Sequence, residues 1–187
     1  MGADYVLTVM SRDRVGIVSG MTEAIVELDG NIDAISQTVM RGYFTIILTV
    51  HFDADVPAER LAVAARESGS PGELEVSVKE RTAGPGRPVV ADAERFILTV
   101  SGRDRPGIIH RITSYLASRS INIEDLYAYS EGEEFLLTAQ LEVPPGPEVE
   151  RLQMDVESLW PAGEMTVALQ HENVFLATNH VDFRQEV

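Results

Sequence analysis

The chain has no cysteine, a single lysine and no long hydrophobic run. The absence of cysteine excludes disulfides, thiol catalysis and thiolate metal sites. The only lysine is Lys79 and the arginines form no cluster. The sequence therefore lacks the basic patch whose phosphate contacts dominate direct nucleic-acid binding. No apolar segment approaches the roughly 20 residues that a membrane-spanning helix needs, and the N-terminus has no signal-peptide pattern. We therefore expect a cytoplasmic protein that binds neither nucleic acid nor membranes directly.

Acidic residues outnumber basic ones in both halves of the chain. The 187 residues carry 15 basic and 30 acidic groups, a formal net charge of −15. Residues 1–82 have 7 basic and 13 acidic groups, and residues 93–172 have 6 and 14. The excess is therefore not an acidic tail, and its ordinary role is to keep the protein soluble.

The sequence contains an internal repeat. Residues 5–17 return as residues 96–108, 91 positions later, and 11 of the 28 positions in 5–32 and 96–123 are identical. The register then continues without a gap, so that Phe44 meets Phe135 and Glu73 meets Glu164. A period near 90 is too long for a solenoid repeat and is the size of a small domain. We expect four segments: a first domain at 1–82, a Gly- and Pro-rich linker at 83–93, a second domain at 94–172, and a docked tail at 173–187.

Each copy has the periodicity of a βαββαβ unit. Apolar residues alternate in the predicted strands and recur at spacings of three and four in the predicted helices. Gly30 is expected to end the first helix in a left-handed cap. The order predicts an α+β fold of two tandem ferredoxin-like domains, each a four-stranded antiparallel sheet with helices on one face. The predicted strands are 5–10, 31–40, 43–52, 73–79, 95–101, 121–129, 134–143 and 164–171, and the predicted helices begin at 13, 57, 106 and 147.

The motif Arg-Asp-Arg-x-Gly follows the first strand of each copy. A helix that starts at Asp13 or Asp104 would direct unpaired N–H groups into this loop, where they favour a carboxylate. Gly16 and Gly107 would let a ligand approach the backbone closely. The aspartates could pair with an ammonium group, which together with the amides suits an amino-acid zwitterion. They could equally be N-caps that need no ligand, and recurrence in both copies does not separate these interpretations.

The strand, the Arg-Asp-Arg-Pro-Gly-Ile-Ile run at 103–109, the helix and Asn-Ile at 122–123 resemble the ACT domain, a small-molecule-sensing module of amino-acid metabolism. The resemblance covers 5–80 and 96–171. It implies that an amino acid binds between paired domains, through the loop before the first helix and the start of the second strand. The chain departs from the dehydrogenase-type pattern in having Asp where that loop has an amide, and glycine at 102. The candidate ligand-binding residues are Ser11, Asp13, Gly16, Ile17, Asn31, Gly102, Asp104, Gly107, Ile108 and Asn122.

A chain of two ACT copies resembles the glycine cleavage system transcriptional repressor family, whose members are thought to act through a partner transcription factor. The leading interpretation is thus a regulatory protein that senses a small amino acid, glycine or serine before larger ones because Ile17, Ile32, Ile108 and Ile123 are bulky. The alternative is a protein–protein interaction module with no metabolite ligand. We identify no catalytic constellation and expect no enzyme, no cofactor and no metal site, since the four histidines are scattered. The effector, the partner and a homodimeric state stay open.

Overall fold

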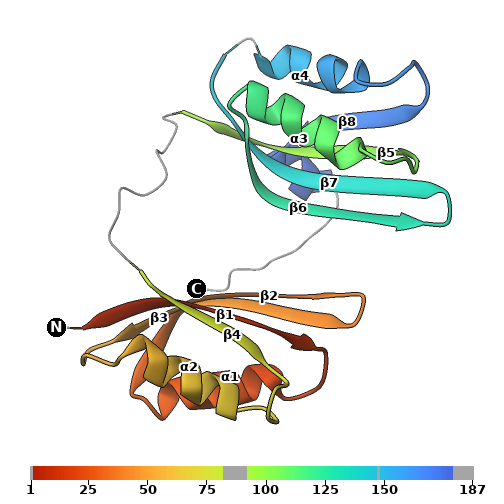
Figure 1. Ribbon diagram of the computed structural model, residues 1–187. Helices are drawn as coiled ribbons and strands as arrows, with labels where there is room; N and C mark the ends of the chain where they lie inside the picture. The colour runs from red at the N-terminus through yellow and green to blue at the C-terminus, as the bar shows by residue number, and fades with distance from the viewer. Residues whose placement is uncertain (1, 82–91, 147, 179–187) are drawn as a thin grey trace. The chain divides into compact units, whose positions relative to one another are not determined.

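Each repeat forms its own compact unit in the computed structural model, which describes residues 2–81, 92–146 and 148–178. The chain divides into residues 1–86 and 87–187. In each unit two helices cover one face of a four-stranded antiparallel sheet, and the opposite face carries neither of them (Figure 1).

The order βαββαβ occurs twice, as predicted. The first sheet has the strand order β2-β3-β1-β4 and the second β6-β7-β5-β8. The elements of the first unit are β1 Ala3–Arg12, α1 Ile17–Val26, β2 Gly30–Met40, β3 Tyr43–Phe52, α2 Ala58–Glu67 and β4 Glu75–Glu80. Those of the second are β5 Glu94–Arg103, α3 Ile108–Ser118, β6 Asn122–Glu131, β7 Glu134–Val143, α4 Glu148–Glu157 and β8 Met165–His171, followed by α5 Glu172–Thr178.

The hydrophobic core of each unit lies between the sheet and its two helices. On β3, Phe44, Ile46, Leu48, Val50 and Phe52 are all buried, which confirms the predicted alternation. The helix α1 contributes Ile17, Met21 and Ile25 to the same core, at the predicted spacing of four. The second unit repeats this arrangement with β7 and α3. Burial of these faces is the main favourable term in the folding of both units.

The predicted helix starts at residues 13 and 106 are wrong. The helices begin later, at Ile17 and Ile108, because the preceding glycines adopt the left-handed conformation. Gly16 has φ 93° and Gly107 has φ 92°, values that cost a side-chain-bearing residue about 1–2 kcal/mol. The glycines therefore end an extended loop and open the helix, instead of lying inside its first turn.

The predicted left-handed cap at Gly30 is also wrong. Asp29 has that conformation, with φ 57°, which short polar residues tolerate. Gly30 already belongs to β2, where a Cβ would lie 2.5 Å from Cε1 of Phe52. The glycine is needed for packing against an aromatic ring and not for backbone turning.

The first part of the predicted tail is the short helix α5, which lies against β5 and β8. Its first residue, Glu172, accepts a hydrogen bond of 2.7 Å from Nε2 of Gln140 and lies 4.0 Å from Arg95. Most of the predicted linker, and residues 179–187 of the tail, lie outside the described residues. Among the helices that the structure describes, none combines the length and hydrophobicity needed to cross a membrane.

Candidate functional site

The loop between the first strand and the first helix is fastened to the neighbouring hairpin in both units. The backbone N–H of Asp13 donates to the carbonyl of Gly42 at 3.0 Å, and that of Asp104 donates to the carbonyl of Glu133 at 2.7 Å. These carbonyls belong to the turns β2–β3 and β6–β7. The motif therefore occupies one end of its sheet, beside a hairpin turn.

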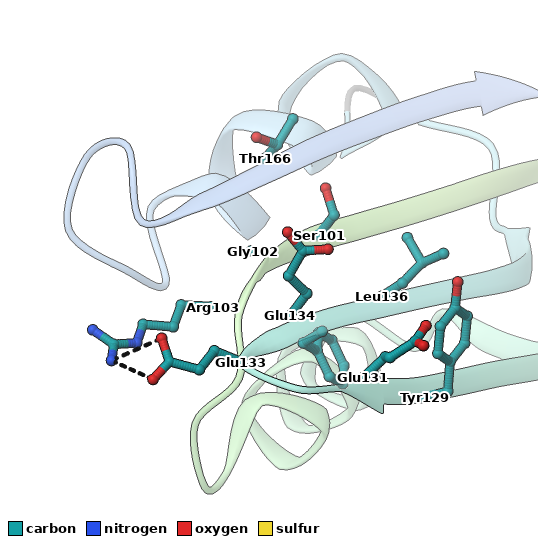
Figure 2. Close-up of a pocket in the computed structure, with 10 residues that line it drawn as sticks. Ser101, Gly102, Arg103, Tyr129, Glu131, Glu133, Glu134, Leu136 and Thr166 are labelled. Atoms are coloured by element: carbon teal, nitrogen blue, oxygen red, sulfur yellow. Dashed lines mark hydrogen bonds and ion pairs between the residues drawn. The ribbon is translucent and has the colours of Figure 1, made fainter.

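The first arginine of the motif packs on that same hairpin. In the first unit the guanidinium of Arg12 lies 4.3 Å from the ring centroid of Tyr43, a cation–π contact. In the second unit Arg103 forms an ion pair of 3.1 Å with Glu133 (Figure 2). The two units thus use different chemistry to hold the same position.

The second arginine joins the loop to the turn before the last strand. Arg14 binds Glu73 through both Nε and a terminal nitrogen, the latter at 3.0 Å from Oε2. Arg105 binds Oε2 of Glu164 at 2.7 Å. The hydrogen bond from Arg14, with one from the Ser70 N–H, lowers the pKa of Glu73 to about 2. This carboxylate is therefore ionised at physiological pH.

The aspartate between the arginines is exposed, and of the two interpretations left open for it the N-cap is wrong. The residues at the N-cap positions are Gly16 and Gly107, and neither helix has a side-chain cap. Among the described residues, the carboxylates of Asp13 and Asp104 have no hydrogen bond or ion pair. Each carboxylate can therefore interact with a cation from solution.

The helix start next to each aspartate has unpaired donors. The first intrahelical bond runs from Gly20 N–H to the Gly16 carbonyl in α1, and from Arg111 N–H to the Gly107 carbonyl in α3, both at 3.0 Å. The three N–H groups that follow each glycine thus have no acceptor within the helix, and they carry the positive end of the helix dipole. Hydrogen-bond donors for an anion and an exposed carboxylate thus lie within about two turns' length of chain, between Asp13 and Ser19 in the first unit.

The predicted site residues Ile17 and Ile108 contribute only their backbone. Both side chains are 3% exposed and belong to the cores. They cannot narrow a pocket in the loop, and the other two isoleucines of that prediction, Ile32 and Ile123, lie next to Asn31 and Asn122 at the other end of the sheets. The predicted preference for a small ligand therefore loses its steric basis.

The asparagines predicted to complete the cradle lie at the other end of the sheet. Asn31 pairs with His51 of β3, which in turn pairs with Asp4 of β1. Asp4 and Arg12 are eight residues apart on one strand, a separation of roughly 26 Å at 3.3 Å per residue. Asn122 has the equivalent position on β6. Within one unit, therefore, the strand-start asparagine and the motif loop cannot bind the same amino acid.

The two residues that precede the motif arginine differ for a steric reason. Ser11 is 6% exposed, and its hydroxyl donates to the carbonyl of Arg12 at 2.9 Å. At Gly102 a Cβ would lie 2.5 Å from both the Glu164 carbonyl and Sδ of Met165. The carbonyl of Glu164, just before β8, and the side chain of Met165 thus take the space of a side chain, which explains the glycine that departs from the family pattern.

A hollow lies on the face of each sheet opposite its two covering helices, where Gly102 is the one ligand residue that the motif pattern predicted. In the second unit it measures about 680 Å³ and is lined by Gly102 and by Tyr129, Glu134, Leu136 and Thr166, which Figure 2 shows around one end of the sheet. The first unit has a hollow of about 320 Å³ beside Thr8 and Thr45. The alternation of Tyr127 and Tyr129 on β6 is a signal that could have indicated this face.

The structure also assigns partners to the motif arginines that the sequence pattern did not reveal. The sequence did contain a signal for these partners, because the glutamates Glu73 and Glu164 occupy matching positions of the repeat. No group of three metal-ligating side chains occurs among the residues with described positions.

The fold and the loop geometry define a tandem pair of ACT domains. A model of the ACT domain family matches residues 4–79 and 94–170. These two matches cover most of the chain, which therefore belongs to the ACT domain family.

Each of the curated relatives matches a segment of this chain that is about as long as one ACT copy. A UPF0237 protein of Listeria monocytogenes is 38% identical over 73 residues, which are 39% of this chain and 81% of the relative. A UPF0237 protein of the archaeon Methanopyrus kandleri is 39% identical over 74 residues, which are 39% of this chain and 80% of the relative.

Solved structures share the tandem fold. An unknown protein from Galdieria sulphuraria has a TM-score of 0.73 at 22% identity, with 91% of this chain and 99% of that chain covered. A candidate glycine cleavage system transcriptional repressor has a TM-score of 0.66 at 19% identity, with 91% and 97% covered. At these identities the similarity establishes the architecture of two ACT copies.

Proposed function

We propose that this chain is a regulatory protein that binds an amino acid at the Arg-Asp-Arg-x-Gly loops and passes the signal to a partner. The observation that carries the proposal is the repeated combination of free helix N–H groups, an exposed aspartate and a left-handed glycine. The amide N–H groups donate to the carboxylate of the ligand, and Asp13 or Asp104 accepts hydrogen bonds from its ammonium group. Membership of the ACT family supports a regulatory, amino-acid-sensing role.

We propose further that the ligand takes groups from more than one ACT copy. The asparagine that the family resemblance assigns to the ligand is about a strand's length away from the loop of its own unit. An asparagine from another ACT copy, in the same chain or in a second one, would have to approach that loop. A ligand held between two copies binds one arrangement of them better than another, which is the requirement for a signal.

We propose a small amino acid as the effector and a transcription factor as the partner. The glycine cleavage name of a protein with the same fold makes glycine the first candidate. Serine, which adds only a hydroxymethyl group to glycine, is the second. The chain has one lysine and a net charge of −15, so regulation of transcription would require a DNA-binding partner.

A thermal-shift screen of the full chain against the standard amino acids tests the proposal. A ligand at 100 times its Kd stabilises the folded state by about 2.7 kcal/mol, so glycine or serine should raise Tm by several degrees. Glycine amide and glycine methyl ester, which lack the carboxylate, serve as matched controls and should have no effect. If no amino acid changes Tm, the sensing proposal is wrong.

The alternative function, an interaction module without a ligand, has one observation in its favour. The sheet faces opposite the two covering helices carry exposed apolar side chains, including Met10, Tyr43 and Ile47 in the first unit and Tyr127 and Tyr129 in the second. This alternative predicts an unchanged Tm with every amino acid and self-association or partner binding that substitution of Ile47 or Tyr127 by serine weakens. Sedimentation velocity of the wild-type chain and of these serine variants, with and without glycine, separates the two functions.

A further inference from the structure

The ion pair between the motif loop and the turn before the last strand is built in the same way in both units. The glutamates Glu73 and Glu164 are 91 residues apart, as are their partners Arg14 and Arg105. Each glutamate closes a tight turn, with its N–H bonded to the carbonyl of Ser70 at 3.0 Å or of Pro161 at 3.1 Å. The turn thus holds the carboxylate facing the loop.

In the first unit the arginine also holds the backbone of the loop. Arg14 donates from a terminal nitrogen to the carbonyl of Val15 at 3.1 Å. A Cβ on Gly16 would lie 3.7 Å from the same nitrogen, so the guanidinium lies beside the glycine. Because the peptide unit is planar, fixing the Val15 carbonyl also fixes the direction of the Gly16 N–H.

Glu73 determines the position of this arginine. It binds the guanidinium through two parallel bonds, which fix the plane of the fork as well as its place. It also accepts the Ser70 N–H at 2.7 Å, so the carboxylate itself is held. A continuous chain of contacts therefore runs from the turn at Ser70 to the peptide of Gly16.

The second unit lacks the last contact of this series, the hydrogen bond from the arginine to the backbone of the loop. Among the described residues, Arg105 donates to Glu164 and makes no bond to the backbone of its own loop. The residue at the position of Val15 is Pro106, whose ring fixes φ near −65°. Proline thus restricts the backbone there by covalent geometry, where the first loop uses a hydrogen bond.

We propose that Arg14, oriented by Glu73, is the positioning residue that orders the first loop for its ligand, and that Pro106 has this role in the second loop. The inference rests on the proposed function for the identity of the ligand, but loop order can be measured without one. Ionisation of Glu73 persists through the physiological pH range because its pKa is about 2. Val15 is 97% exposed and makes room for a proline.

The experiment measures the ¹⁵N order parameters of Gly16 and Gly107 in the full chain, and then titrates glycine and serine while recording both amide resonances. We expect Glu73→Gln to lower the order parameter of Gly16 and to weaken binding at the first loop by about three- to tenfold, the value of one lost hydrogen bond. Glu164→Gln should change Gly107 less. The control Glu59→Gln, which removes the surface pair with Arg66, should change neither amide.

Rescue separates positioning from general destabilisation. The double variant Val15→Pro with Glu73→Gln should recover the order parameter of Gly16 and the lost affinity, since proline replaces the hydrogen bond as the restraint. If Glu73→Gln leaves the order of Gly16 equal to that in Glu59→Gln, or if proline restores nothing, the positioning role is refuted. If wild-type Gly16 and Gly107 amides respond to no amino acid, the proposed function fails, while the order parameters still decide the positioning role.

Discussion

Replacement of Gly107 by alanine tests whether a ligand approaches the backbone at the start of α3. Gly107 has φ 92°, and no atom lies within 4 Å of the place that a Cβ would take. The methyl group thus meets open space, and the cost is the backbone strain of about 1–2 kcal/mol. For a domain of this size 1 kcal/mol lowers Tm by about 4–8 °C, so the second unit should remain folded.

Gly132→Ala is the matched control. Gly132 lies in the β6–β7 turn of the same unit, has φ 62° and also has open space around it. Calorimetry should give both variants a similar loss of stability. Isothermal titration with the effector should then detect loss of binding at the second loop in Gly107→Ala only, because there the methyl group occupies the space of the ligand.

Two results would refute this reasoning. Equal affinity of the two variants at the second loop, read from the amide of Ile108, would mean that the ligand does not contact Gly107. Complete unfolding of Gly107→Ala would mean that the strain exceeds that of an ordinary left-handed residue, and that the space around this glycine is not open in the folded protein.

Three further predictions concern other parts of the chain. Gly102→Ser should destabilise the second unit by about 1–3 kcal/mol in urea unfolding, since its Cβ would overlap the backbone beside Met165; an unchanged midpoint contradicts this. Nδ1 of His51 lies 2.7 Å from Oδ1 of Asp4, and the hydrogen bond raises the pKa of the imidazole. The stability that this pair contributes is therefore complete below pH 6.5 and is lost as the pH rises through the folded-state pKa of His51. NMR titration of Asp4→Asn should give a lower His51 pKa, and an equal value argues against the pair. Leu98→Ala removes a fully buried core side chain and should cost about 2–5 kcal/mol; a loss under 1 kcal/mol would contradict the assigned core.

Much of the fold was predictable from local patterns. The strand Tyr43–Phe52 has the predicted bounds, because alternation of apolar residues has only one interpretation when every second side chain is large. The βαββαβ order followed from the same periodicity and from the repeat, which supplied each assignment twice. The predicted strands 31–40 and 43–52 leave only Arg41 and Gly42 for the turn between them, and both residues have positive φ.

For the loop that carries the candidate site, the sequence predicted the position along the chain but not the backbone conformation. The sequence indicated Asp13 and Gly16 as members of one loop, but it left open a capping aspartate, whereas the structure has a left-handed glycine at the N-cap. Helix-start preferences are local and weak, and the hydrogen bond from Asp13 to Gly42 extends the strand into the loop and delays the helix.

By itself, the sequence determined the duplication, the class of fold, the core faces and the acidic surface, since each depends on the order and spacing of residues along the chain. Tertiary structure alone decided the partners of Arg14 and Arg105, the crowding at Gly102 and the distance between Asn31 and its own loop. These depend on which segments antiparallel pairing brings together. Glu73 is 59 residues from Arg14, yet it binds that arginine, whereas Asn31 is 15 residues from Gly16 and lies at the opposite end of the sheet.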